Sequence, residues 1–125
     1  MSALKKILIV EDSLIIQELL SETLGPNRFQ IILADNAERA LEILERERPH
    51  LILLDVMLPG PMNGLEVARK IRTQFSKNAC PIFMITAKGQ TRDIQAGYDA
   101  GANEYFIKPF SPTHLLERAD AHLGG

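Results

Sequence analysis

The chain has 125 residues, 46% of them hydrophobic and 24% charged, and its formal net charge at pH 7 is −2. This composition is typical of a soluble globular protein, gives no electrostatic case for direct nucleic-acid binding, and contains no apolar run near the ~20 residues of a membrane span. The N-terminal MSALKK lacks the apolar region of a signal peptide, and the single cysteine, Cys80, excludes an internal disulfide, so we expect a cytoplasmic protein without membrane insertion.

Apolar runs that suit buried strands alternate along the chain with segments whose apolar residues recur at helical spacing. The first run covers residues 4–10, and the helix after it would extend from Ser13 to the GPN break at 25–27. A second strand is predicted at 29–34. The inner face of the helix between them is predicted to consist of Ile16, Leu19, Leu20, Thr23 and Leu24.

The middle of the chain repeats this pattern. Asn36 is a suitable N-cap for a helix that ends before Pro49, and the third strand would cover 50–55. The loop PGPMNG (59–64) then leads into a third helix. The buried residues of the second helix are predicted to be Ala37, Ala40, Leu41 and Leu44, and those of the third Val67, Ala68, Ile71 and Phe75.

The last part of the chain predicts a fourth strand at 81–86, a weaker helix at 90–100 that Gly97 interrupts, and a fifth strand at 104–108. Ser111 followed by a proline predicts the cap and first turn of a final helix. That helix would bury Leu116, Ala119 and Leu123. Five strand–helix units in alternation predict one α/β domain over residues 1–125, with a parallel sheet covered by helices on both faces.

Polar residues stand where four of the predicted strands end. Right-handed crossovers bring the carboxyl ends of parallel strands to one edge of the sheet, where open sheets of this class bind ligands. The residues at that edge would be Glu11, Asp12, Asp55, Thr86 and Lys108. Each has an ordinary alternative role, since a strand-end acid can be a helix cap, a threonine a loop hydroxyl, and a lysine a solvated charge.

Together these residues suit a metal-bound phosphoryl group. Three adjacent carboxylates repel one another unless a cation lies between them, and Mg²⁺ prefers oxygen ligands from one or two carboxylates plus a phosphate. The lack of paired histidine and cysteine argues against zinc. Lys108 would add a second positive centre and Thr86 a hydroxyl, while Asp55 could act as a carboxylate nucleophile.

Four motifs at these strand ends are IVEDS (9–13), LLDVMLPG (53–60), MITAK (84–88) and EYFIKPF (104–110). At these spacings the chain resembles the response-regulator receiver domain of two-component signalling, in a chemotaxis-regulator-like form, over essentially its whole length. The resemblance implies a flavodoxin-like, doubly wound, five-stranded sheet of order 2-1-3-4-5 with five helices. It also implies a signalling switch that catalyses only its own phosphorylation and dephosphorylation.

The resemblance assigns roles to individual residues. Asp55 would accept a phosphoryl group from a sensor histidine kinase or a histidine phosphotransfer protein, and Thr86 and Lys108 would contact its oxygens. Tyr105 would be an aromatic switch residue, and the bond between Lys108 and Pro109 would be cis. The ligands of Mg²⁺ would be the side chains of Glu11, Asp12 and Asp55 and the backbone carbonyl of Met57.

The chain departs from the family pattern after the third strand. PGPMNG has one extra residue near Pro61 and an asparagine, Asn63, where the family commonly has aspartate, so the loop path and the helix start are left open. Two residues beyond Asp55 and Thr86 stand Met57 and Lys88, and neither can orient a water as an amide or a carboxylate does. We therefore expect slow self-dephosphorylation.

Partner surfaces are predicted on two sides of the domain. Helix four, strand five and helix five would form the output surface, whose partner the sequence does not identify. A docking surface for the phosphodonor would comprise Leu14, Ile15, Pro109 and Phe110, although the first two could simply fill the first turn of their helix.

Three alternatives to the receiver interpretation can be weighed against single residues. A haloacid-dehalogenase-type phosphatase needs a second acid two residues after Asp55, where Met57 stands, and a flavodoxin-like cofactor carrier needs a phosphate loop where the acidic EDS stands. A degenerate receiver that acts only as an interaction module is the remaining alternative. The sequence also leaves open whether the chain is a complete single-domain regulator or part of a longer protein.

Overall fold

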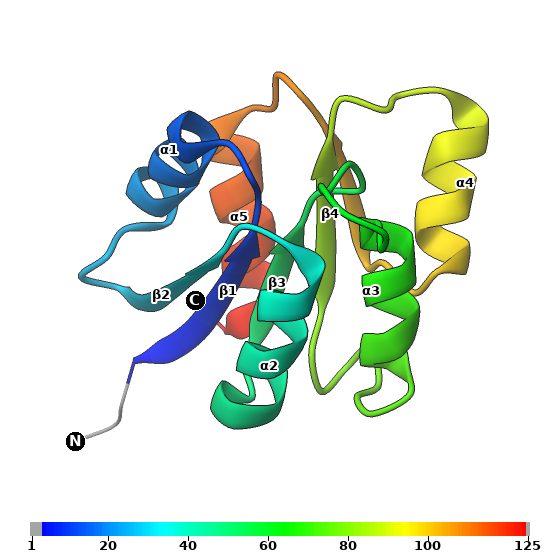
Figure 1. The fold of residues 1–125 in the computed structure, drawn as a ribbon. Coiled ribbons are helices and arrows are strands. Elements are labelled where there is room, and N and C mark those ends of the chain that lie inside the picture. Colours follow the sequence, from blue (N-terminus) through cyan, green and yellow to red (C-terminus); the bar gives the residue numbers. More distant parts are fainter. Residues whose placement is uncertain (1–3, 125) are drawn as a thin grey trace.

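The computed structural model describes residues 4–124, so residues 1–3 and 125, at the ends of the predicted domain, lie outside the described part. Strands and helices alternate through this part in the predicted order (Figure 1). Their bounds are β1 Lys5–Val10, α1 Leu14–Leu24, β2 Phe29–Ala34, α2 Ala37–Glu47, β3 Leu51–Leu54, α3 Gly64–Arg72, β4 Ile82–Thr86, α4 Thr91–Asp99, β5 Glu104–Ile107 and α5 Pro112–Leu123.

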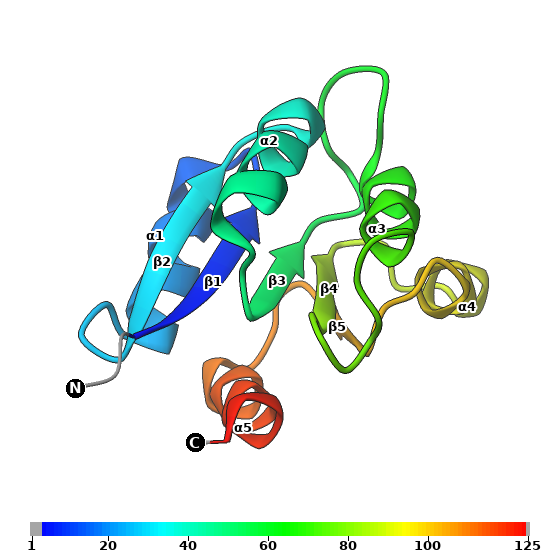
Figure 2. The ribbon, with the colours of Figure 1, turned by 90° about the horizontal axis from the view of Figure 1, so that it is seen from below.

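The strands form one parallel sheet in the order β2-β1-β3-β4-β5. Helices α1 and α5 cover one face and α2, α3 and α4 cover the other (Figures 1 and 2). The predicted flavodoxin-like, doubly wound fold is therefore confirmed. The direction in which successive strands are added to the sheet reverses between β1 and β3, which are neighbours. The topological switch point therefore lies beside their carboxyl ends. No helix within residues 4–124 is both long and apolar enough to cross a bilayer.

Side-chain alternation along the central strands divides the core in two. In β3, Leu51 and Leu53 face α1 and α5, while Ile52 and Leu54 face the other three helices. All four are at most 1% exposed, because a parallel strand with helices on both sides buries both of its faces. Cys80 is buried, and its thiol donates to the Pro49 carbonyl at 3.3 Å.

Side-chain caps fix where the helices begin. Ser13, Asn36 and Ser111 each accept a hydrogen bond from the backbone N–H three residues later, as the sequence predicts for Asn36 and Ser111. The start of α3, which the inserted residue left open, is set by a capping box between Asn63 and Glu66.

Gly64, the first residue of α3, lies directly against the backbone of Asp55. A Cβ at this position would overlap the Asp55 carbonyl oxygen, so no larger residue fits without displacing one of the two segments. The N–H of Gly64 also donates to the Val56 carbonyl at 2.9 Å. The glycine therefore lets α3 begin beside the end of β3.

Three predictions about helix faces are wrong in detail. Leu19 is 40% exposed, and Gln17 takes the inward position on α1 because its amide donates to the buried carbonyl of Glu11 at 2.6 Å. Leu115 rather than Leu116 is fully buried in α5, since adjacent leucines point ~100° apart and either satisfied the apolar spacing. In α2, the buried Ile43 was missed.

Candidate functional site

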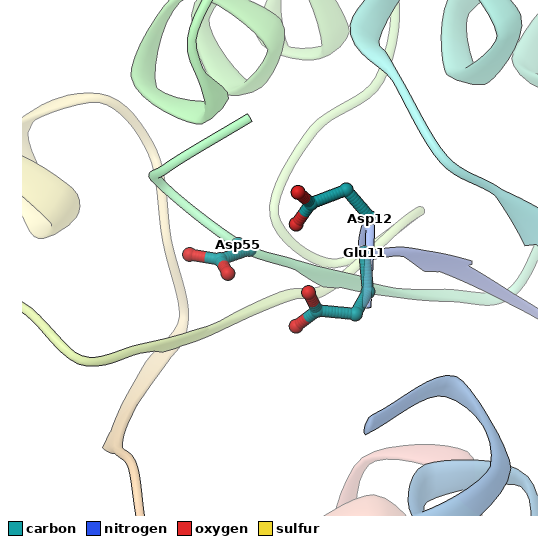
Figure 3. Close-up of side chains that lie close together, drawn as sticks. All are labelled: Glu11, Asp12 and Asp55. Atoms are coloured by element: carbon teal, nitrogen blue, oxygen red, sulfur yellow. The ribbon is translucent and has the colours of Figure 1, made fainter. Parts of the chain in front are cut away.

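Three carboxylates meet at the carboxyl edge of the two central strands. Glu11 and Asp12 directly follow β1, and Asp55 directly follows β3, its neighbour in the sheet. One oxygen from each lies within 4.8 Å of the others, and Figure 3 shows the three side chains close together. Glu11 and Asp55 are only 3% and 6% exposed, whereas Asp12 is open to solvent.

Lys108, which follows β5, bridges the two buried acids. Its Nζ lies 2.6 Å from Glu11 Oε1 and 2.9 Å from Asp55 Oδ2. Burial by itself would lower the pKa of Lys108, but its hydrogen bonds to Glu11 and Asp55 outweigh burial and raise it. Burial, with a smaller contribution from the Asp55 charge, raises the pKa of Glu11 despite the opposing bonds from Lys108 and the Ser13 N–H.

Two backbone N–H groups and one side-chain amide also position the two buried acids, Glu11 and Asp55. The Met57 N–H donates to Asp55 Oδ1 at 2.9 Å, and the Ser13 N–H donates to Glu11 Oε2 at 3.1 Å. Gln17 fixes the main chain of Glu11 through the bond described above. Sequence analysis missed Gln17, and its only signal would have been a polar side chain one turn before the buried Leu20.

Thr86 and Tyr105 are connected through a single intervening residue. Thr86 ends β4 and is fully buried, and its Oγ1 lies 3.4 Å from the Lys88 N–H. The Tyr105 hydroxyl donates to the Lys88 carbonyl at 2.7 Å, while its ring lies so close to Gly97 that a Cβ there would be 2.7 Å from it. Burial, followed by the charges of Asp93 and Asp55, raises the pKa of Tyr105.

The four predicted docking residues lie around this edge with different exposures. Leu14 and Ile15, in the first turn of α1, are 73% and 78% exposed. Pro109 is exposed and follows a cis peptide bond, as the resemblance implied. Phe110 is half-buried against the core beneath α1 and α5, so it also serves packing.

The donor set at this edge fits Mg²⁺. All the clustered ligand atoms are carboxylate oxygens, which are the ligands that a hard divalent cation prefers, and no histidine or cysteine belongs to the cluster. Asp12 is exposed, so an ion could reach the cluster from the solvent on its side. The buried acids, Glu11 and Asp55, are held in place by Lys108 and backbone N–H groups.

A doubly wound parallel domain with an acidic pocket and a lysine at the switch point defines the receiver class of signalling domains. The family model described as "Response regulator receiver domain" matches residues 7–120. The chain belongs to this family.

Named relatives agree with this assignment. The chain is 39% identical over 119 residues to the DNA-binding response regulator MtrA of Mycolicibacterium paratuberculosis, covering 95% of this chain and 51% of the relative. The MtrA protein of Mycobacterium tuberculosis is also 39% identical, with 95% of this chain and 50% of that protein covered. The chain thus spans about half the length of these relatives.

Solved structures share the fold closely. The BeF3-activated N-terminal receiver domain of Klebsiella pneumoniae RstA is 33% identical, with a TM-score of 0.87, over 95% of this chain and 98% of that one. The Vibrio cholerae chemotaxis protein CheY4 is 31% identical, with a TM-score of 0.84, also over 95% and 98%.

Proposed function

We propose that Asp55 is a phosphoacceptor that takes its phosphoryl group from a phosphohistidine on a sensor histidine kinase or phosphotransfer protein. The observation that carries this proposal is the setting of Asp55 itself. Its side chain is 7% exposed, one carboxylate oxygen meets the Lys108 ammonium, and the other meets the Met57 N–H. A nearly buried nucleophile is thereby held in one orientation, with a positive charge beside it.

The transfer step needs little beyond positioning and charge neutralisation. An Asp55 oxygen attacks phosphorus, the P–N bond of phosphohistidine breaks, and its electron pair leaves on the imidazole, which takes up a proton. The product is an aspartyl phosphate, and Lys108 neutralises part of the charge on its oxygens. Glu11, Asp12, Asp55 and the Met57 carbonyl would hold Mg²⁺, which when bound neutralises phosphoryl charge.

The adduct would then change the output surface. Thr86 ends β4, the strand next to β3, and a movement of its hydroxyl toward the phosphoryl oxygens would disturb its contact with Lys88, to which Tyr105 is also bonded. Helix α4 would respond, because the ring of Tyr105 lies against Gly97, the one buried residue of this helix. The result is a population shift on the surface of α4, β5 and α5, which an output partner detects.

The phosphodonor would dock around the same edge, on Leu14, Ile15, Pro109 and Phe110. A domain of this kind is a switch that catalyses only its own phosphorylation and dephosphorylation, in the cytoplasm, and does not itself contact nucleic acid. Residues 1–125 would make up this one receiver unit, whatever output domain its longer relatives carry.

A small phosphodonor tests the proposal directly. Incubation with Mg²⁺ and acetyl phosphate is expected to produce a hydroxylamine-labile adduct that maps to Asp55 by mass spectrometry. Asp55→Asn should abolish the adduct, and omission of Mg²⁺ should strongly reduce it. If the folded wild-type chain stays unmodified with Mg²⁺ present, the degenerate-receiver alternative replaces this proposal.

A further inference from the structure

The loop that departs from the family pattern builds a cavity beside the acidic edge. A half-open hollow of about 310 Å³ lies between the start of α2 (Asn36, Ala37, Glu38) and the loop residues 59–62. Figure 2 shows the β3–α3 loop extending alongside α2. The extra residue near Pro61 therefore forms part of its wall.

The cavity is held open by anchored residues. Leu58, just before the loop, is 8% exposed, and Met62 packs on the core beneath α2 and α3. The capping box at Asn63 then fixes the loop's exit into α3. A ligand would thus meet a surface already formed, without ordering a flexible loop.

The walls combine apolar surface with a single charge. Pro59, Pro61, Met62 and Ala37 contribute apolar surface, and Glu38 is the only charged residue in the lining. Among the ion pairs formed within residues 4–124, none involves Glu38.

The neighbouring cation does not neutralise Glu38. Arg39 pairs with Glu42, at 3.4 Å along the same helix. Glu38 lies in the first turn of α2, where the helix dipole favours a carboxylate, and it is exposed to solvent, so a ligand can reach it.

We propose that this cavity receives an arginine side chain presented by the protein that phosphorylates Asp55. The three methylenes of arginine would lie along the proline and methionine surface while the guanidinium meets Glu38. Arginine fits better than lysine because its guanidinium is more weakly hydrated and can form two parallel bonds to a carboxylate.

The position of the cavity indicates that its partner is the phosphodonor. The loop that forms its wall begins two residues after Met57, whose N–H bonds to Asp55. A protein that brings a histidine to Asp55 would approach the same carboxyl edge of the sheet, where the cavity also lies. The inference rests on the proposed phosphoacceptor function and adds a contact that would help this chain to select its donor.

Nuclear magnetic resonance on the whole chain can test the recognition chemistry. The probes are N-acetyl-arginine N-methylamide and its neutral norleucine analogue, added in saturating Mg²⁺ so that the guanidinium does not compete for the acidic cluster. The arginine probe is expected to shift the Gly60 amide and the Met62 methyl saturably. Its affinity should exceed that of the norleucine probe about threefold, as expected for a partly exposed ion pair.

Matched variants make the test decisive. Glu38→Gln should weaken the arginine probe about threefold, while Glu45→Gln, an exposed acid two turns further along α2, should leave its affinity unchanged. Deletion of Pro61 should remove the response in a chain that otherwise keeps its spectrum. Equal binding of the two probes, or an unchanged affinity in Glu38→Gln, would overturn the proposal.

Kinetics with a purified histidine kinase that phosphorylates the wild-type chain address the partner. Glu38→Gln should raise KM for this chain about threefold with little change in kcat, whereas phosphorylation by acetyl phosphate should be unaffected. An unchanged KM would refute docking at the cavity. Failure of acetyl phosphate to modify the wild type would instead refute the phosphoacceptor function itself, so the two failures can be told apart.

Discussion

The hydroxyl of Tyr105 donates a 2.7 Å hydrogen bond to the backbone carbonyl of Lys88. Lys88 also contacts Thr86 through its N–H, so one residue of the β4–α4 loop connects the end of β4 with a side chain of the neighbouring strand β5. Because the ring of Tyr105 lies against Gly97, we expect a displacement of Lys88 to reach α4 through this side chain.

Tyr105→Phe should loosen this connection without impairing the acidic site. The lost hydrogen bond should cost about 0.5–1.5 kcal/mol of unfolding free energy. We expect faster amide exchange over residues 87–90 and unchanged labelling by acetyl phosphate. Tyr98→Phe, at a position 39% exposed, is the control. Equal exchange in the two variants would show that the Tyr105 hydroxyl does not restrain the loop.

Lys108→Met should destabilise the metal-free protein. It leaves Glu11 and Asp55 close together without their shared cation. The loss should be roughly 1–3 kcal/mol, below the ~3–5 kcal/mol of a fully buried pair, because the Lys108 side chain is 20% exposed. Mg²⁺ should restore part of the stability and bind more tightly than to the wild type. Calorimetry with both proteins measures this, and weaker Mg²⁺ binding by the variant would contradict it.

Met57→Asn should shorten the lifetime of the aspartyl phosphate. Met57 is 54% exposed beside Asp55, and its thioether cannot orient an attacking water, whereas an amide can. We expect slow loss of the phosphoryl group from the wild type and a several-fold faster loss from the variant. Phosphate release after removal of the donor provides the rates. A wild-type half-life of seconds would contradict the expectation.

Glu104 should make stability depend on pH in the acid range. Burial alone would raise its pKa, but hydrogen bonds from Arg118 and His122 outweigh burial and lower it. A lowered pKa in the folded state adds stability above the unfolded value of 4.5, and this stability is lost as pH falls through the folded pKa. Glu104→Gln should therefore be less stable than the wild type near neutral pH, with the difference vanishing in strong acid. Urea unfolding of both proteins across this pH range measures the stability difference and shows whether it has the expected sign.

Gly64→Ala should affect both folding and the site. The added Cβ overlaps the Asp55 carbonyl oxygen, so α3 or the end of β3 must move, at a cost of roughly 1–3 kcal/mol. Labelling of Asp55 should slow as well. Gly89→Ala is the comparison, because its Cβ meets only side-chain atoms of Ile107, the nearest at 3.1 Å, rather than backbone, and should cost less. Equal losses would exclude backbone crowding at Gly64 as the cause.

The sequence was sufficient to predict the edge at which the site forms. Continuous apolar runs fixed the strands, and parallel connection then brought Glu11, Asp55 and Lys108 together without knowledge of any distance. The bridging position of Lys108 could not be predicted, because it depends on a side chain crossing the end of β4.

The remaining misses have a common physical origin. Gln17 was not identified because its inward position depends on a partner carbonyl rather than on its own polarity. Gly64 was not singled out because the need for a glycine arises only where two backbones approach each other. The cavity beside Glu38 likewise depends on the path of an inserted loop, for which the spacing of apolar residues carries no information.

The ammonium between Glu11 and Asp55 has a consequence for the timing of a response. Because these like charges are already held together and partly neutralised when the chain folds, a phosphodonor meets a site that is already formed. The rate at which this domain reacts should accordingly follow how often a donor encounters it, rather than how quickly its own residues rearrange.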